Sequence, residues 1–405
     1  MSAGASHAKP GPIEFIVLMA LMVSLVALSI DAMLPALGEI GADLGVVREN
    51  DTQWIVTALF LGLAVAQLLY GPLSDSIGRK PAIYLGMAVF VVGCLLSIFA
   101  TDFTLMLTGR VLQGIGAAGP RIVTIALVRD GYEGRAMARI MSFVMAVFIL
   151  VPALAPMLGQ GIVMIAHWRG IFVFFLLLAL FASTWLAIRQ PETLAPDRRV
   201  AFSFKQTAAA IVESCTNRTA FGYMLAAGLI FGAFVGYLNS AQQIFQVQYG
   251  VGAAFPFYFA ALALSIGCAS YLNARLVMRH GMRVLSRWAL MALSALSVAF
   301  LVVTYLMAGH PPLWALMAYC LLSFFCLGVL FGNFNALAME PLGHIAGTAA
   351  AVIGSLTTFL SLVFGLLIGQ AFDGTVLPLI GGFAGLGLAA LAVMSWTERG
   401  RKFSR

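Results

Sequence analysis

Charged residues are scarce in this chain. Asp, Glu, Lys and Arg make up only 10% of its 405 residues, whereas soluble domains carry about 25% charged residues. Cysteine and histidine are also few, with five of each, and their spacing is not that of a metal site or a disulfide framework. These shortages disfavour a soluble enzyme domain, a disulfide-stapled scaffold and a metal-dependent activity. We therefore expect no metal and no other cofactor.

Long apolar segments take the place of charge. Hydrophobic residues make up 61% of the sequence, and runs of about twenty recur, each long enough to cross a hydrocarbon core about 30 Å thick. The fold class is therefore all-α integral membrane, with twelve predicted transmembrane helices. Their predicted bounds are 13–37, 52–72, 82–100, 104–128, 137–162, 168–188, 220–247, 254–278, 284–307, 312–337, 345–371 and 376–396.

The basic residues are unevenly distributed over the predicted loops. All but four of the 23 Lys and Arg fall on the side that holds both termini; Arg48 and Arg169 fall on the other side, and Arg110 and Arg121 fall inside spans. Because basic loops stay in the cytoplasm, we expect both termini there. The net charge of +7 therefore reflects topology, and we expect no nucleic-acid partner.

The longest and most polar connection predicts a boundary between two six-helix bundles. It spans residues 189–219 and separates a first bundle, 1–188, from a second, 220–405. Apolar residues recur at helical spacing over 204–215, which predicts a short helix on the inner membrane surface. We expect this helix to tether the bundles rather than to regulate them.

A weak internal repeat supports the two-bundle interpretation. Gly281 and Arg283 follow the eighth span as Gly78 and Lys80 follow the second, about half a chain away. Such a repeat is typical of transporters built from two related halves. We therefore expect the two bundles to be pseudo-symmetric.

Ionisable residues inside membrane spans are costly, so each one needs a reason. Asp31 and Arg110 lie at about 9 and 10 Å from the outer ends of their predicted helices, and we predict an ion pair between them. A carboxylate with an exchangeable partner suits proton coupling, although a static bridge between two helices is the alternative. Arg121 lies nearer the inner end, within possible reach of Glu14, and we expect it to extend to the inner headgroups.

Several uncharged polar side chains also fall inside spans at depths that suit a central cavity. Hydrogen bonding between helices is the more common role of such side chains, so the cavity role is one of two interpretations. The candidate cavity residues are Gln113, Asn239, Gln242 and Asn333.

The connection between the second and third spans carries a compact charged motif. Residues 71–81 read GPLSDSIGRKP, which resembles motif A of the major facilitator superfamily at nearly every position. The resemblance implies that Gly71, Asp75, Gly78, Arg79 and Lys80 form a gating motif that locks the outward-facing state. The alternative is that these charges only enforce topology.

Two further segments resemble one branch of that superfamily. Residues 29–37, SIDAMLPAL, are similar to the first-helix signature of Bcr/CflA drug-resistance transporters, with Ala and Met where that subfamily favours Met and Tyr. Residues 107–116, LTGRVLQGIG, resemble motif B of drug/proton antiporters. By this resemblance, Arg110 would take part in proton transfer, and Asp31 in proton coupling or substrate binding.

The fifth span contains a helix motif like that of antiporters. Residues 152–160 read PALAPMLGQ, and Pro152, Pro156 and Gly159 match motif C, although two of its glycines are replaced. Physically, two prolines and a glycine bend a helix and permit close packing against a neighbour.

The function implied is proton-coupled efflux of small drug-like or amphiphilic molecules across the bacterial inner membrane by alternating access. The energy source would be the proton gradient, and the partners would be a small-molecule substrate, protons and the lipid bilayer. We expect a monomer and no enzymatic activity. A proton-coupled importer of a metabolite with the same fold is the main alternative, and a non-transporting receptor or membrane enzyme is a weaker one.

Overall fold

The computed structural model describes residues 11–399, apart from the side chains at 135 and 138. The predicted cytoplasmic termini lie outside the described residues. Within residues 11–399 the regular structure is helical throughout. The long helices are α1 (Pro12–Asp31), α3 (Trp54–Ile77), α4 (Arg79–Ile98), α5 (Phe103–Gly131), α6 (Gly134–Ala166), α7 (Arg169–Arg189), α9 (Arg218–Gln242), α10 (Phe255–His280), α11 (Met282–Leu306), α12 (Leu313–Met339), α13 (Ala346–Gln370) and α14 (Leu377–Glu398).

The prediction of twelve transmembrane helices is confirmed over the described part of the chain. Eleven segments are long and apolar enough to cross a membrane. One of them, Leu313–Gln370, is 58 residues long and comprises α12 and α13, joined by the 3₁₀ turn Glu340–Ile345. Two shorter helices, α2 (Leu37–Asp43) and α8 (Phe204–Thr216), complete the order, and α8 is the helix predicted in the central connection.

The first span differs from its prediction, because α1 ends at Asp31 rather than continuing to residue 37. A proline ring clashes with the carbonyl of the residue four positions earlier and supplies no N–H. Pro35 has this effect on Asp31, and the chain continues as a 3₁₀ turn, Leu34–Ala36, before α2 begins. Asp31 is therefore the last residue of its helix, and not a residue within it.

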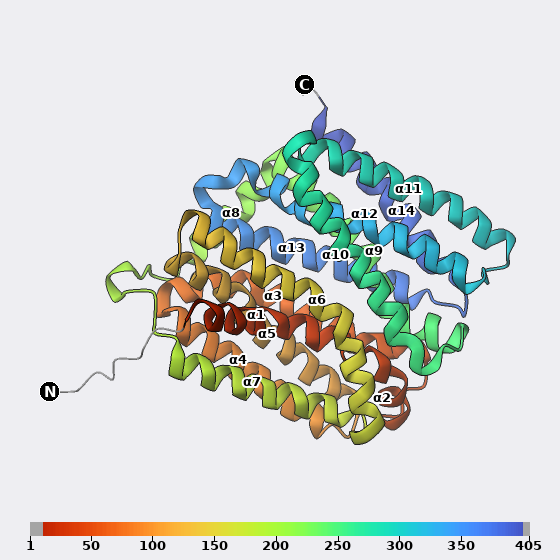
Figure 1. Ribbon diagram of the computed structural model, residues 1–405, viewed down its shortest axis with the longest axis horizontal. Helices are drawn as coiled ribbons and strands as arrows, with labels where there is room; N and C mark the ends of the chain where they lie inside the picture. Colours follow the sequence, from red (N-terminus) through yellow and green to blue (C-terminus); the bar gives the residue numbers. More distant parts are fainter. Residues whose placement is uncertain (1–10, 400–405) are drawn as a thin grey trace.

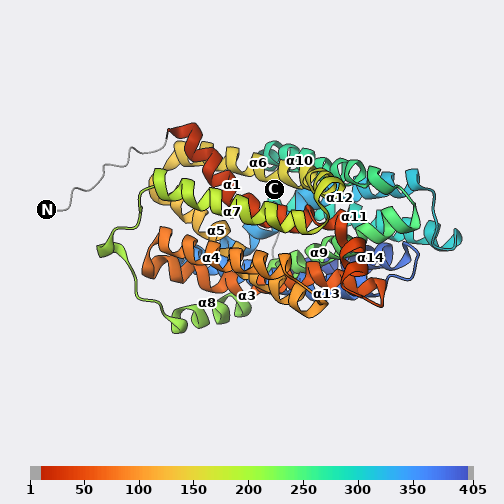
Figure 2. The same cartoon turned by 90° about the horizontal axis from the view of Figure 1, so that it is seen from below.

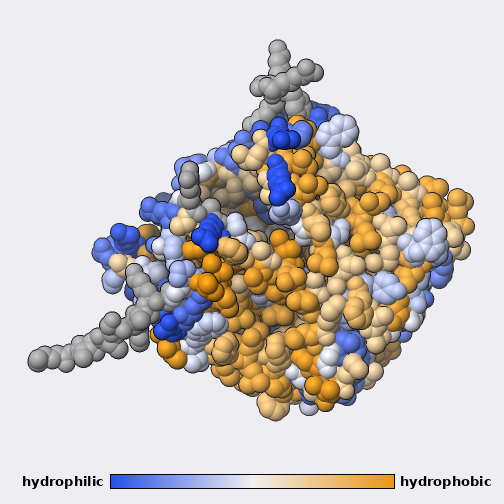
Figure 3. Space-filling view, viewed as in Figure 1, coloured by the Kyte–Doolittle hydropathy of each residue, from blue (hydrophilic) through white to orange (hydrophobic). Residues whose placement is uncertain are grey.

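Helices α1 to α7 pack together as one half of the molecule, and α9 to α14 as the other (Figure 1). The halves meet along two seams, where α3 contacts α13 and α6 contacts α10. Figure 2 shows these seams along opposite edges of the molecule. The face of the molecule that Figure 3 shows is broadly apolar, and its hydrophilic residues gather mainly toward the connection between the halves. Such a surface is suited to lipid contact.

Close packing of α3 against α5 depends on glycine. A Cβ atom added to Gly62 would lie 2.1 Å from the Val111 carbonyl oxygen, and one added to Gly114 would lie 2.0 Å from that of Leu59. Small residues let membrane helices approach to backbone contact, where van der Waals packing is strongest. This contact fixes α5, and therefore Arg110, against the start of α3.

The predicted repeat between the second and eighth spans is visible in the backbone. Gly78, between α3 and α4, has φ 109° and ψ 161°, and Gly281, between α10 and α11, has φ 77° and ψ 155°. Residues other than glycine rarely adopt a positive φ. Both halves thus make the corresponding helix connection with a glycine in similar conformation.

Candidate functional site

A cavity of about 400 Å³ lies between the two halves, bounded by α1, α3, α5, α6, α9, α10, α12 and α13. Its wall is mostly aromatic and aliphatic, with Phe60, Phe231, Phe234, Phe324 and Phe331 among the lining residues. The polar lining residues are few and come from both halves. They are Asp31, Gln67, Arg121, Tyr237, Asn335, Thr357 and Thr358.

Beyond the end of the cavity that holds Asp31, the two halves are joined by a polar plug, which we define as Asn50, Gln53, Gln243 and Gln370. Gln53 Nε2 donates to Gln243 Oε1 at 2.6 Å, and Gln243 Nε2 donates to Asn50 Oδ1 at 2.8 Å. Gln370 Nε2 donates to the Asn50 carbonyl at 2.7 Å. These contacts join the start of α3 in the first half to the ends of α9 and α13 in the second.

The other end of the cavity, which we call the linker end, holds the turn between α3 and α4 and residues 190–217. Two contacts join the halves near the middle: Gln67 Nε2 to Thr358 Oγ1 at 3.3 Å, and Ser355 Oγ to the Ala64 carbonyl at 2.6 Å. Both of these contacts join α3 to α13. These contacts and the polar plug thus join the halves away from the linker.

Asp31 faces the cavity from the broken end of α1. Its residue is 5% exposed, and its carboxylate makes no hydrogen bond or ion pair with any described residue. Tyr237 of α9 also lines the cavity, and its hydroxyl is buried without a hydrogen-bond partner in the described structure. An acid and an unsatisfied hydroxyl are therefore both available to a ligand or a proton.

Arg110 does not pair with Asp31, so the predicted ion pair is wrong for this conformation. Its Nη2 donates to the Ser29 carbonyl at 2.7 Å, and its Nε donates to the Ile55 carbonyl at 3.1 Å. The break at Pro35 leaves carbonyls at the end of α1 without helical partners. The fully buried Arg110 satisfies one of them and places a positive charge at the negative end of the helix dipole.

Gln113 supports Arg110 and does not line the cavity, which corrects its predicted role. Its Oε1 accepts from Arg110 Nη1 at 2.5 Å, and its Nε2 donates to Ser97 Oγ at 2.9 Å and to the Gly93 carbonyl at 3.1 Å. These partners lie on α4, so Gln113 joins α4 to α5. Helix α5 contacts α4 on one side and the cavity on another, and Gln113 lies on the side that contacts α4.

The other three predicted cavity residues are also absent from the cavity wall. Asn239 and Asn333 take the alternative role, hydrogen bonding between helices, whereas Gln242 bonds one turn further along its own helical segment. Asn239 donates to the Gly365 carbonyl at 3.2 Å, Gln242 donates to Gln246 at 3.1 Å, and Asn333 exchanges hydrogen bonds with Asn273 at 2.9 and 3.0 Å. Depth alone did not tell which way these side chains face.

Arg121 is in the cavity wall rather than at the headgroup level. The acid considered as its partner, Glu14, is bound instead by Arg189 at 2.6 and 2.7 Å and by Trp185 at 3.0 Å. One sequence signal indicates the cavity, since Arg121 is one of two arginines within the predicted spans. Its short distance from the inner end of the helix instead favoured the headgroup region, and that prediction is wrong.

The motif in the fifth span packs against the end of α1. Pro152 lines the cavity, and both Pro152 and Pro156 lie inside the continuous helix α6. A Cβ atom added to Gly159 would lie 1.6 Å from the Ala32 carbonyl oxygen. The close approach predicted for this glycine is therefore present, and it occurs directly beside Asp31.

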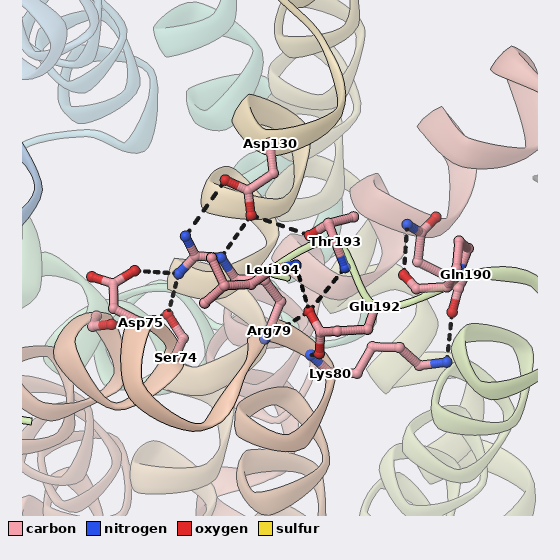
Figure 4. A network of polar contacts seen from close by, with 11 residues as sticks. Ser74, Asp75, Arg79, Lys80, Asp130, Gln190, Glu192, Thr193 and Leu194 are labelled. Atoms are coloured by element: carbon pink, nitrogen blue, oxygen red, sulfur yellow. Dashed lines mark hydrogen bonds and ion pairs between the residues drawn. The ribbon is translucent and has the colours of Figure 1, made fainter. Parts of the chain in front are cut away.

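The charged motif between α3 and α4 forms a network at the linker end (Figure 4). Arg79, 7% exposed, forms ion pairs with Asp75 and with Asp130 near the end of α5, the latter at 2.7 Å. Its Nη1 also donates to Ser74 Oγ at 2.9 Å. Arg79 therefore joins α3, α4 and α5, three helices of the first half.

Glu192 in the connection completes this network, a role that the sequence analysis did not assign. Its carboxylate accepts the backbone N–H of Arg79 at 3.0 Å and of Lys80 at 2.9 Å, which are unpaired donors at the start of α4. Lys80 Nζ in turn donates to the Gln190 carbonyl at 2.5 Å. The sequence offers one signal for this role, because a carboxylate is suited to a helix N-terminus.

A buried cavity between two helix bundles, closed at one end and bordered at the other by a charged connection, is the architecture of a secondary transporter. The chain belongs to the Major Facilitator Superfamily, whose family model matches residues 19–366. This is a family of transporters and not of enzymes. The protein is accordingly a multi-pass membrane protein of this family.

Several proteins similar to this chain are named for drug resistance. It is 31% identical to a bicyclomycin resistance protein homolog from Haemophilus influenzae, over 90% of this chain and 91% of that one. It is 26% identical to multidrug resistance protein D of Escherichia coli, over 85% of each chain. The structure of the human organic anion transporter MFSD10 covers 95% of this chain with a TM-score of 0.70 at 18% identity, which shows the shared fold.

Proposed function

We propose that this protein exports small drug-like or amphiphilic molecules across the bacterial inner membrane in exchange for protons. The cavity is the observation that carries the proposal, because it is apolar, lies between the two halves and contains an acid without an ion-pair partner in residues 11–399. Ligand sites of this kind are mostly apolar with a few placed polar groups. The relationship to drug-resistance proteins favours drug-like substrates.

Asp31 is the residue to which we assign the proton. A carboxylate that faces an apolar cavity without a cationic partner favours its protonated form, and solvation by water or a neighbouring cation favours its charged form. Alternating access changes that environment twice in each cycle. Arg110 holds the end of α1 through the Ser29 carbonyl, so we assign it the positioning of Asp31 rather than direct pairing.

The orientation follows from the basic residues of the linker end. We place that end in the cytoplasm, as the uneven distribution of Lys and Arg indicates. With the polar plug then on the outer side, the conformation is closed to the outside. The network of Asp75, Arg79 and Asp130 is already formed in this conformation and lies within the first half. It would lock the outward-facing state if the exposed carboxylate of Asp75 contacts a helix end of the second half when the cytoplasmic end closes.

The proposal is tested by efflux in cells and by proton movement in vesicles. An efflux-deficient bacterial host that expresses the chain should gain resistance to some members of a panel of apolar antibiotics. Inverted membrane vesicles should release part of an imposed pH gradient when such a compound is added. Asp31→Asn should abolish this release, whereas Asp51→Asn, at the exposed ion pair with Arg48, should not.

Resistance without any effect on the pH gradient would contradict proton coupling. An unchanged response of Asp31→Asn to the pH gradient would show that Asp31 is not the coupling residue. A chain that inserts normally and yet protects against no compound of the panel would contradict drug export.

A further inference from the structure

Arg121 is the one cation among the residues that line the cavity, and nothing in the proposed proton coupling uses it. Its side chain is partly buried in the wall. The described structure shows no hydrogen bond or ion pair to its guanidinium. Arginine remains charged at any physiological pH, and an unpaired charge inside a membrane protein is costly unless water or a counter-ion compensates it. The wall therefore presents a permanent positive charge to whatever enters.

We propose that Arg121 binds the carboxylate of an amphipathic aromatic acid, so that such acids are substrates of this transporter. This inference rests on the proposed transport function. A guanidinium matches a carboxylate through two parallel hydrogen bonds, which gives both affinity and orientation. The proposal names a substrate class that the apolar wall alone does not select.

The acids of the protein itself do not occupy this cation. Asp31 is the acidic residue among those that line the cavity, and it forms no ion pair with Arg121. The depths of the two residues differ: Asp31 lies about 28 Å along α1 from its start, and Arg121 lies about 15 Å from the end of α5. Both distances are measured from the linker end, so Asp31 lies deeper, toward the plug. Glu14 is held by Arg189.

The aromatic part of the cavity wall selects the rest of the ligand. Phe60 of the first half and Phe231 of the second form an edge-to-face pair with 6.2 Å between ring centroids, and Phe231 forms another with Phe331 of its own half at 5.4 Å. Such walls favour flat aromatic bodies. The cavity volume, about 400 Å³, is within the range of pockets for small drug-sized molecules. The ligand is therefore an acid with a compact aromatic body.

The test measures binding of a matched pair of probes, naphthalene-2-carboxylate and naphthalene-2-carboxamide, in radiolabelled form. The full chain is purified into nanodiscs of uncharged lipid, and equilibrium binding is measured for both probes. The wild-type protein should prefer the carboxylate. Arg121→Gln should weaken carboxylate binding by about tenfold or more and leave amide binding unchanged.

Two further variants separate charge recognition from structural damage. Arg121→Lys keeps the charge but not the planar fork, so it should retain part of the preference for the carboxylate. Arg48→Gln removes an exposed arginine outside the cavity and should leave both affinities unchanged. Amide binding reports on the integrity of the cavity in every variant.

The proposal is overturned if the wild-type protein binds both probes equally, binds neither, or keeps its preference for the carboxylate in Arg121→Gln. Failure of this proposal is distinguishable from failure of the transport function. If the wild-type protein exports uncharged compounds but does not prefer the carboxylate probe, only the proposed role of Arg121 is contradicted. If carboxylate binding depends on Arg121 but no compound is exported, the transport proposal is contradicted and the carboxylate site remains supported.

Discussion

At the scale of single residues, the buried arginine of α5 acts through backbone carbonyls. Arg110 donates to three oxygens on three helices: the Ser29 carbonyl, the Ile55 carbonyl and Gln113 Oε1. Lysine has the charge but cannot reach three acceptors arranged around a planar fork. Replacement therefore removes hydrogen bonds as well as a charge, in a place where water does not substitute.

We expect Arg110→Lys to lower the thermal stability of the purified protein and to abolish transport. Each hydrogen bond from a charged donor contributes about 1.5–3 kcal/mol, and at least one acceptor is left unsatisfied. The measurement is thermal unfolding in detergent, compared with Arg48→Lys at the exposed loop pair. An Arg110→Lys protein that melts at the temperature of this control would contradict the role of Arg110 in holding the end of α1.

The sequence placed Asp31 and Arg110 inside spans of the first half, and both are buried there, but it did not predict their partners. Counting residues along a helix gives depth, whereas the direction of a side chain depends on which helices surround it. Gln113 and Asn333 are buried, and a buried position can face either the cavity or a neighbouring helix, so hydropathy does not distinguish the two. Arg121 was misplaced for the same reason.

At the scale of elements, the broken end of α1 and the motif of α6 form one unit. The carbonyl of Ala32, next to Asp31, lies where a Cβ on Gly159 would be. Hydropathy predicted the first span as far as residue 37, because Ala36 and Leu37 are apolar, and it missed that Pro35 ends the helix early. The consequence is local, since the remaining spans were predicted close to their observed bounds.

Gly159→Ala should push α6 away from α1 and impair transport. The added methyl group overlaps the Ala32 carbonyl oxygen at 1.6 Å, and overpacking costs about 1–3 kcal/mol or more. Gly161→Ala is the matched control, because no atom lies within 4 Å of its added Cβ. Transport assays and thermal unfolding of both variants check the expectation. Equal activity of the two variants would show that this contact does not position Asp31.

The charged turn between α3 and α4 gives a second prediction at this scale. Asp75→Asn removes one of the two carboxylates that hold Arg79, so the helix ends are fixed less firmly and the transport rate should fall strongly. Asp197→Asn, at an exposed position of the connection, should have little effect. A normally inserted Asp75→Asn protein with full transport would mean that these charges only enforce topology.

At the scale of the whole molecule, the composition of the chain determines most of the fold. Apolar runs of the right length must form helices in a bilayer, because every backbone polar group has to be satisfied within its own segment. The arrangement of the two halves is different, because it depends on a few polar contacts between distant residues. Asn50 and Gln370 are far apart in the chain, and no local sequence pattern predicts the hydrogen bond between them.

The polar plug should therefore control which side of the membrane the cavity faces. Gln53→Ala removes the hydrogen bonds to Gln243 Oε1 and to the Gly369 carbonyl, at 2.6 and 2.9 Å, which exist only while this end is closed. Each is worth about 1 kcal/mol, and 1.4 kcal/mol changes a population ratio about tenfold. The variant should thus open toward the outside more often, by a factor on the order of ten.

Labelling of a cysteine in the cavity measures this shift. Thr357, which lines the cavity, is replaced by cysteine in a protein whose five native cysteines are removed, and a membrane-impermeant maleimide is added outside intact cells. Gln53→Ala should raise the labelling rate. Gln248→Ala is the matched control, because its hydrogen bond to the Gly309 carbonyl lies within the second half and does not change on opening. Equal labelling rates in the two variants would show that the plug does not hold the outer end closed.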